Sequence, residues 1–135
     1  MNLNYNKATN IDIEHIYRFT KQQIDTYEKV LSWVRKKIEN RIEEYIVIYE
    51  NGEKAGYYRF YRNEEGEYEI DDLYIFPEFQ NKGIGLFVIN KCCCEVNNPV
   101  ILYVFIRNDR AVSLYKRLGF EVVKNINDSR YIMKK

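Results

Sequence analysis

Hydrophobic residues in the first third of the chain recur at helical spacing. The stripe consists of Ile13, Ile16, Ile24, Tyr27, Leu31, Val34, Ile38 and Ile42. Intervals of three, four and seven residues place side chains on one face of an α-helix. Asn10 is suited to cap a helix that begins near Ile11. The pattern predicts either one long amphipathic helix or, in better agreement with it, two with a break near Glu28–Ser32, after a short edge strand at Leu3–Lys7.

The period then changes from helical to alternating. Tyr45–Tyr49 is rich in β-branched and aromatic residues, and Asn51-Gly52 after it is typical of a tight hairpin turn. A second aromatic run covers 55–62, and Glu64-Glu65-Gly66 marks another turn. These features predict an antiparallel meander that leads into a third strand at 67–76.

The third strand changes phase part-way along. Tyr68 and Ile70 alternate in one phase, whereas Leu73 and Ile75 alternate in the other. One extra residue at Asp71-Asp72 restores a common face, which predicts a β-bulge. Bulges are often found next to active sites. A strand buried on both faces is the alternative.

The rest of the chain alternates between helical and strand patterns. The predicted order is a glycine loop at Gln80–Gly85, a helix at 83–97, a buried strand at 100–106, a helix at 110–118 closed by Gly119, and strands at 120–124 and 130–134. Strands 67–76 and 100–106 must be parallel, because a helix connects them. The chain therefore reads as a single domain, 1–135, with a mixed α/β fold.

Composition fits a globular protein and excludes a membrane span. The chain has 135 residues, of which 46% are hydrophobic and 30% charged. No stretch approaches the roughly 18 apolar residues that would cross a bilayer, and the N-terminus carries no apolar signal run. The adjacent residues Cys92, Cys93 and Cys94 cannot converge on one metal from a helix. We expect reduced thiols, no metal and a cytoplasmic location.

Charge is unevenly distributed along the chain. Residues 51–72 hold three basic and seven acidic side chains, a net of −4, whereas residues 73–135 hold ten and five, a net of +5. An acidic segment attracts cations and a basic one attracts polyanions, although a solvated surface with chance clustering is the alternative. Because no dense basic stripe is present, we expect no nucleic-acid partner; a protein that binds nucleic acid through its basic half is the weaker hypothesis.

The predicted strand, glycine loop and helix N-terminus together favour the binding of an anion. The loop lacks the Gly-Lys-Ser/Thr ending of a P-loop, and position 88 is Val where the dinucleotide fingerprint has a third glycine. Two other segments stand out. The first is Leu73-Tyr74-Ile75-x-Pro77-Glu78 followed by Gln80-x-x-Gly83-x-Gly85. The second is Asn108-x-x-Ala111-x-x-Leu114-Tyr115-x-x-Leu118-Gly119-Phe120. Both segments resemble motifs of the GNAT acetyltransferase superfamily, and the resemblance covers nearly the whole chain.

The resemblance implies a three-layer α/β/α fold and a site for acetyl-CoA. It implies a mixed sheet of about six to seven strands that splays between 67–76 and 100–106, with the pantetheine arm in the gap. The implied CoA-binding residues are Leu73, Tyr74, Ile75, Gln80, Asn81, Lys82, Gly83, Ile84, Gly85, Asn108 and Tyr115. Four nearby cations either help to neutralise the 3′-phosphate or are simply solvated: Arg107, Arg110, Lys116 and Arg117.

The implied activity is acetyl transfer from acetyl-CoA to a primary amine by direct aminolysis in a ternary complex. Tyr115 is the expected general acid for the leaving thiolate, and a backbone N–H near Leu73 or Ile75 is expected to hold the oxyanion. Glu69 is the expected general base. Asp71, Asp72 or a water chain are the alternatives. His15, the single histidine, is expected on a helix surface and without a role.

The acceptor is left open by the sequence. Six acids in the nine residues 64–72 favour a cationic amine, on a small molecule or a peptide. A monomer and a homodimer are equally compatible with the sequence. A non-catalytic acyl-CoA-binding module is the alternative to an enzyme.

Overall fold

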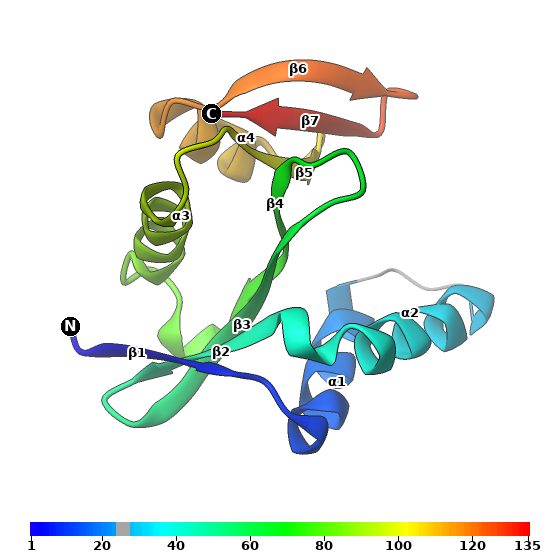
Figure 1. The fold of residues 1–135 in the computed structure, drawn as a ribbon, viewed down its shortest axis with the longest axis vertical. Helices are drawn as coiled ribbons and strands as arrows, with labels where there is room; N and C mark the ends of the chain where they lie inside the picture. The colour runs from blue at the N-terminus through cyan, green and yellow to red at the C-terminus, as the bar shows by residue number, and fades with distance from the viewer. Residues whose placement is uncertain (24–27) are drawn as a thin grey trace. The chain divides into compact units, whose positions relative to one another are not determined.

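The computed structural model describes the backbone of residues 1–23 and 28–135 and the side chains of residues 1–22 and 33–135. The described helices are α1 (Ile13–Gln23), α2 (Glu28–Asn40), α3 (Ile84–Glu95) and α4 (Asp109–Arg117) (Figure 1). The described strands are β1 (Leu3–Lys7), β2 (Tyr45–Glu50), β3 (Glu53–Arg62), β4 (Tyr68–Ile75), β5 (Val100–Phe105), β6 (Glu121–Ile126) and β7 (Arg130–Lys134). They form one mixed sheet in the order β1-β2-β3-β4-β5-β7-β6, which confirms the predicted fold class.

The chain divides into two compact units, each built from separate stretches of sequence. The first unit comprises residues 1–59 and 72–85, and the second comprises residues 60–71 and 86–135. The chain passes from one unit to the other within β3, within β4 and at the start of α3. The assignment of residues 1–135 to one domain stays a prediction.

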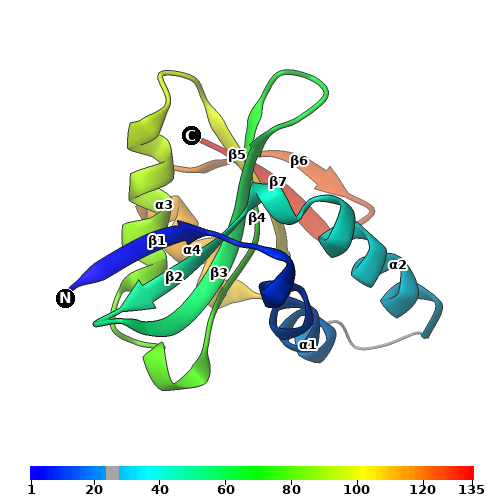
Figure 2. The ribbon, with the colours of Figure 1, turned by 60° about the horizontal axis from the view of Figure 1, so that its bottom comes forward.

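The sheet of the first unit is an antiparallel meander. β1 pairs with β2, and β2 pairs with β3, so the three strands lie side by side (Figure 2). The turn between β2 and β3 places Asn51 and Gly52 at φ values of 50° and 83°, in the left-handed region that such a turn requires. The hairpin predicted from Asn51-Gly52 is confirmed.

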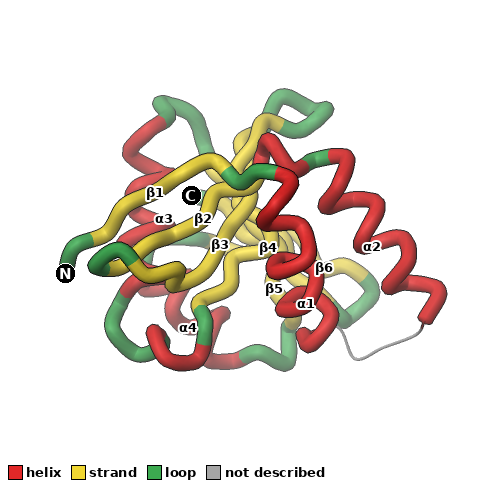
Figure 3. The backbone as a smooth tube through the Cα atoms, turned by 90° about the horizontal axis from the view of Figure 1, so that it is seen from below, coloured by secondary structure: helices red, strands yellow, loops and turns green. Residues whose placement is uncertain are grey.

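The helices α1 and α2 contact each other and supply apolar side chains to the core of the first unit (Figure 3). Its buried residues are Ala8, Ile16, Val34, Ile38, Tyr45, Val47, Tyr57 and Phe76. The predicted stripe members Ile24 and Tyr27, and the side chain of Leu31, lie outside the described residues.

Two helix boundaries differ from the predicted ones. A 3-10 turn at Asn10–Asp12 precedes α1, and the residue at its N-cap is Thr9 rather than Asn10. The Thr9 amide donates to the Asp12 carboxylate at 2.9 Å, so the acid three residues ahead supplies the cap. Two helices are present, as the pattern favoured, but the position expected for the break, Glu28–Ser32, is wrong because α2 runs without interruption from Glu28 to Asn40.

β4 departs from regular strand geometry at the position of the predicted bulge. Asp72 has a φ of 52°, whereas a regular strand keeps φ negative. Upstream of it Glu69 and Ile70 are buried, and the rest of the strand is partly exposed. Because consecutive side chains of a strand face opposite sides of the sheet, β4 is buried on both faces at Glu69–Ile70 and only half-buried along the rest of its length.

The second unit is organised around β5. β4 pairs with β5 in parallel over three residues, Tyr68–Ile70 with Val100–Leu102, as expected for two strands joined by a helix. β5 pairs with β7, and β7 pairs with β6 through a turn at Asn127-Asp128 (Figure 1). The splaying of β4 from β5 beyond Ile70 stays a prediction, since Asp72–Ile75 belong to the first unit. Among the described residues, no helix has the length and apolar character that a membrane crossing requires.

Candidate functional site

The loop that leads from β4 into α3 belongs to the first unit and is tied to the end of β4. A 3-10 turn at Pro77–Phe79 follows the strand, and the Phe79 amide donates to the Phe76 carbonyl at 2.8 Å. The Gln80 side-chain amide then donates to the Ile75 carbonyl at 2.8 Å. The loop between β4 and α3 therefore has a fixed local geometry and is folded back on the strand that precedes it.

The N-terminus of α3 is open on the side of its two glycines. Gly83 has a φ of 84°, which a residue with a side chain rarely adopts. A Cβ built on Gly83 or Gly85 meets no atom within 4 Å. The first amides of a helix have no acceptor within it, and the helix dipole adds positive potential there. This end of α3 can accept an anion at close range.

Lys82 stands beside this helix end and is held by an acid that sequence reasoning missed. Its Nζ lies 3.5 Å from Oε2 of Glu50, the last residue of β2, and 5.4 Å from the centre of the Phe79 ring. Glu50 is only 8% exposed. Among the described residues, Oε2 accepts no hydrogen bond, so the ion pair is its principal compensation. No local pattern links the two positions, because they lie on different elements.

The candidate pantetheine strand, Leu73–Ile75, also lies in the first unit and is anchored to β3. A Cβ on Gly56 would lie 2.2 Å from the Tyr74 carbonyl oxygen, so only glycine permits this approach. One residue further on, the Phe76 amide donates to the Ala55 carbonyl at 2.8 Å. The backbone of this segment therefore has a fixed position on the first unit.

Glu69, the candidate base, lies in the second unit within a small polar network. It is 8% exposed. Its Oε2 accepts a hydrogen bond from the Tyr61 hydroxyl at 2.6 Å, and its Oε1 accepts one from the side-chain amide of Asn63 at 3.4 Å. Both donors lie on or next to β3, where the second turn of the meander begins. A buried carboxylate with both oxygens engaged is held in one orientation.

Tyr115, the candidate acid, is carried by α4 in the second unit. Asn108 caps this helix, and its Oδ1 accepts from the Ala111 amide at 3.3 Å. Burial raises the pKa of the Tyr115 hydroxyl above its ordinary value, so the hydroxyl keeps its proton at neutral pH and can donate it. Its ring packs 6.1 Å from that of Phe120. The basic residues expected near the 3′-phosphate, Arg107, Arg110, Lys116 and Arg117, are all exposed.

Comparison of the sequence with models of known protein families identifies the family of this chain. The model of the Acetyltransferase (GNAT) family matches residues 10–120, which is most of the chain. The chain belongs to the GNAT acetyltransferase family.

Relatives of this GNAT chain agree with its fold. An uncharacterized N-acetyltransferase of Methanocaldococcus jannaschii is 39% identical over 57 residues, which is 39% of this chain and 25% of that relative. The PaiA N-acetyltransferase of Thermoplasma acidophilum, solved with coenzyme A, superposes with a TM-score of 0.74 and 22% identity over 100% of this chain and 99% of its own. The spermidine/spermine N-acetyltransferase SpeG of Vibrio cholerae superposes with a TM-score of 0.74 and 19% identity over 98% of this chain and 92% of its own.

The predicted site residues of this GNAT chain fall into two sets. The first unit holds Leu73, Tyr74, Ile75 and the whole loop Gln80–Gly85. The second unit holds Glu69, Asn108 and Tyr115. Asp71 also lies in the second unit, whereas Asp72, the other alternative base, lies in the first with its carboxylate bound by Tyr45 and Lys37.

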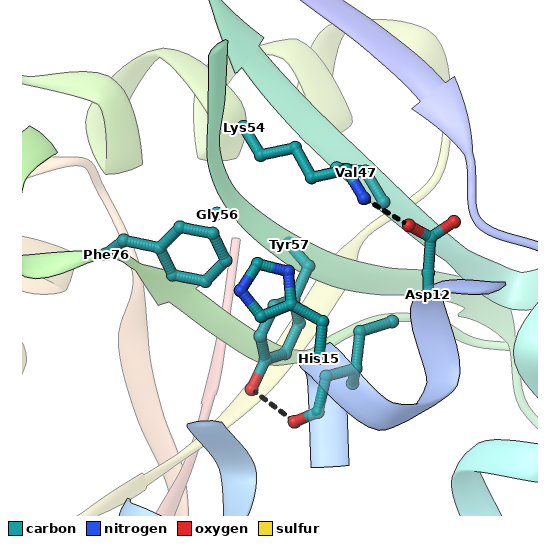
Figure 4. Close-up of a pocket in the computed structure, with 8 residues that line it drawn as sticks. Asp12, His15, Val47, Lys54, Gly56, Tyr57 and Phe76 are labelled. Carbon is teal, nitrogen blue, oxygen red and sulfur yellow. Dashed lines mark hydrogen bonds and ion pairs between the residues drawn. The ribbon is translucent and has the colours of Figure 1, made fainter. Parts of the chain in front are cut away.

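A small pocket in the first unit contains the single histidine (Figure 4). The pocket is shallow and partly open to solvent. His15 is half-buried against the rings of Phe19, at 5.0 Å, and Phe76, at 4.9 Å, so the expectation of a surface position is wrong. Desolvation, together with the cations Lys54 and Arg18, lowers its pKa and keeps it neutral.

The acid in this pocket is structural. Burial opposes ionisation of Asp12, but hydrogen bonds from Lys54, at 2.9 Å, and from the Thr9 amide outweigh it and hold the pKa of Asp12 below its ordinary value. Within the described ranges, no three His, Cys, Asp or Glu side chains are placed to hold a metal ion.

Proposed function

We propose that this protein transfers an acetyl group from acetyl-CoA to a primary amine. The observation that carries the proposal is the open N-terminus of α3, where a Cβ added to either Gly83 or Gly85 would meet no atom within 4 Å. Neither packing nor backbone angle requires glycine at position 85, and glycine in a helix costs about 0.5–1 kcal/mol relative to alanine. The close approach of a phosphate explains why glycine occupies position 85. Membership of the GNAT family indicates that the phosphate belongs to coenzyme A.

The residues of the first unit bind the cofactor in this proposal. The amides of Asn81, Lys82, Gly83, Ile84 and Gly85 hold the pyrophosphate, whereas the Gln80 amide donates to the Pro77 carbonyl at 3.3 Å and closes the turn before the loop. The backbone of Leu73, Tyr74 and Ile75 pairs with the pantetheine arm. Asn108, which caps α4, holds that helix in the orientation that presents Tyr115.

The residues of the second unit carry the proton transfers. The amine nitrogen attacks the thioester carbonyl, and the proton that the amine must lose passes to Glu69, directly or through water. The tetrahedral oxyanion accepts a hydrogen bond from the amide of Leu73 or Ile75. When the C–S bond breaks, Tyr115 donates its proton to the thiolate, which leaves as CoA with a free thiol. The product is the N-acetylated amine.

A cationic amine is the proposed acceptor class. Glu64, Glu65, Glu67, Glu69, Asp71 and Asp72 give the segment 64–72 a strongly negative potential. The SpeG protein of Vibrio cholerae, which has the same fold, is named for spermidine and spermine, and these carry several ammonium groups. We therefore rank polyamines first among acceptors, ahead of amino acids and peptide amines.

Incubation of the purified protein with acetyl-CoA and a panel of amines tests the proposal. Release of CoA thiol, with formation of the N-acetyl product by mass spectrometry, is the expected result for at least one cationic amine. Measured CoA binding without turnover on any amine would favour the alternative, a non-catalytic acyl-CoA-binding module. Absence of both CoA binding and turnover would overturn the proposal.

A further inference from the structure

The position predicted for the bulge in β4 holds a residue with an unfavourable backbone angle. Asp72 adopts a φ of 52°, which non-glycine residues rarely adopt and which aspartate tolerates better than most. Such angles persist only where the surrounding structure fixes them, and they are frequent at functional sites. The surroundings of Asp72 therefore indicate what maintains the bulge.

Two donors from different elements converge on one oxygen of Asp72. Tyr45, the first residue of β2, donates its hydroxyl to Oδ2 at 2.5 Å, and Lys37 of α2 donates its ammonium to the same oxygen at 3.1 Å. Tyr45 is fully buried in the core of the first unit, at 0% exposure, so its hydroxyl has a fixed position. The Asp72 and Lys37 side chains are 21% and 25% exposed, so water screens this pair only in part.

The segment after Asp72 is fixed at its other end as well. The Tyr74 carbonyl lies against Gly56, and the Phe76 amide donates to the Ala55 carbonyl at 2.8 Å. Leu73 lies between these anchors and the clamped carboxylate. The direction of the Leu73 amide is determined by the backbone angles of Asp72, which the hydrogen bonds from Tyr45 and Lys37 hold in place.

We propose that Asp72 is a positioning residue, and that Tyr45 and Lys37 act through it to aim the Leu73 amide. The inference rests on the proposed function, in which the amide of Leu73 or Ile75 stabilises the oxyanion formed from the thioester, and it assigns that role to Leu73. It differs from a role of Asp72 as general base, because a base must take up a proton from the acceptor, whereas this carboxylate serves as an anchor for two protein donors. An oxyanion donor that is displaced or rotated stabilises the transition state less than a donor aimed at the developing negative charge.

Three single variants separate the roles. Asp72→Asn keeps the shape and the tolerance for positive φ but removes the charge that Lys37 binds. Tyr45→Phe removes the hydroxyl and keeps the buried ring. Tyr57→Phe is the matched control, because it deletes another buried tyrosine hydroxyl of the same core, one that pairs with Thr20 at 2.8 Å and with the Ile16 carbonyl at 3.3 Å.

The expected kinetic result is a fall in turnover without a loss of affinity for CoA. We expect Asp72→Asn and Tyr45→Phe each to lower kcat at least about tenfold and to change the Kd for CoA less than about threefold, with the double variant no worse than the stronger single one. The pH profile keeps its shape in Tyr45→Phe. A fall in kcat confined to Asp72→Asn would overturn the proposal and favour Asp72 as the general base. An equal fall in kcat in Tyr57→Phe would also overturn it and would indicate general destabilisation of the core.

A spectroscopic measurement keeps the test independent of activity. In the free protein, the backbone amide resonance of Leu73 in ¹⁵N-labelled samples is expected to shift in Asp72→Asn and Tyr45→Phe and to stay in place in Tyr57→Phe. An unmoved Leu73 resonance in the first two variants overturns the inference whether or not the protein transfers acetyl groups. An inactive wild-type protein whose Leu73 resonance responds as expected would instead count against the proposed function alone.

Discussion

The ammonium of Lys82 lies 3.5 Å from a buried carboxylate oxygen of Glu50 that accepts no hydrogen bond from any described residue. The negative charge thus sits next to the loop proposed to bind a pyrophosphate, where it opposes the anion and holds the cation that would attract it. We expect Glu50→Gln to tighten CoA binding about two- to tenfold, because the substitution releases Lys82 and removes the repulsion. Calorimetric titration with CoA measures the effect.

Lys82→Met is the companion variant for this pair. It should weaken CoA binding, and the salt dependence of the Kd should become shallower because one cation is lost. It should also destabilise the fold, since Glu50 is left buried without its partner. Unchanged CoA affinity in both variants would mean that the phosphates do not approach the loop.

Gly56 and Gly85 give opposite predictions for the same substitution. A Cβ at position 56 would lie 2.2 Å from the Tyr74 carbonyl oxygen, and neither backbone can yield without breaking the anchor at Phe76. We expect Gly56→Ala to lower the free energy of unfolding by about 3 kcal/mol or more, at the upper end of overpacking effects. Urea unfolding followed by circular dichroism measures this change.

Gly85→Ala is the matched control, because the added methyl group meets no atom within 4 Å. Alanine in place of helical glycine should raise the free energy of unfolding by about 0.5–1 kcal/mol. The same methyl group should weaken CoA binding about tenfold, or 1.4 kcal/mol, by obstructing the α3 amides. A stabilised protein with unchanged CoA affinity would contradict the proposed pyrophosphate site.

The elements of the fold were accessible to sequence reasoning wherever a short-range rule applies. The turn at Asn51-Gly52 requires left-handed angles, and the phase change between Ile70 and Leu73 requires an extra residue, so both features could be read from adjacent positions. The helix start at Thr9 was missed because Asn10 is an equally good cap, and the choice depends on the bond between Thr9 and Asp12.

The site was predictable only as a set of motifs. The loop Gln80–Gly85 and Tyr115 carry local signatures, whereas the partners that fix them do not. Glu50 reaches Lys82, and Tyr45 reaches Asp72, through contacts between elements that are distant in sequence. Such pairs depend on strand register and on which face of a helix is buried, and no spacing rule within one segment encodes them.

The three adjacent cysteines should differ sharply in reactivity. Cys92 is buried, and desolvation raises its pKa to about 12, whereas Cys94 is exposed. At pH 8 the thiolate fraction of Cys92 is therefore about 10⁻⁴, so a disulfide reagent should modify Cys94 quickly and Cys92 only after unfolding. Peptide mapping after timed labelling measures both rates. Equal labelling of the two in the folded protein would contradict the buried position of Cys92.

The same thiol contributes to alkaline instability. Its folded pKa lies above the ordinary value of 9.0, so its stabilising contribution is present below pH 9 and is lost as the pH rises toward 12. Cys92→Ala should flatten this part of the stability profile.

Because Cys94 would itself react in any thiol-release assay, Cys94→Ser is the suitable background for measuring turnover.

Tyr115→Phe tests the general acid directly. The variant keeps the ring that packs near Phe120 and removes the proton donor, so we expect kcat to fall about 10²-fold while the Kd for CoA changes little. Burial raises the pKa of the wild-type hydroxyl, so the acid should remain protonated, and turnover should not fall, until the pH exceeds the ordinary tyrosine value. Steady-state kinetics from pH 6 to 11 measure this alkaline limb, which Tyr115→Phe should lack. If the limb persists in the variant, or if kcat is unchanged, another group protonates the leaving thiolate and Tyr115 only packs α4.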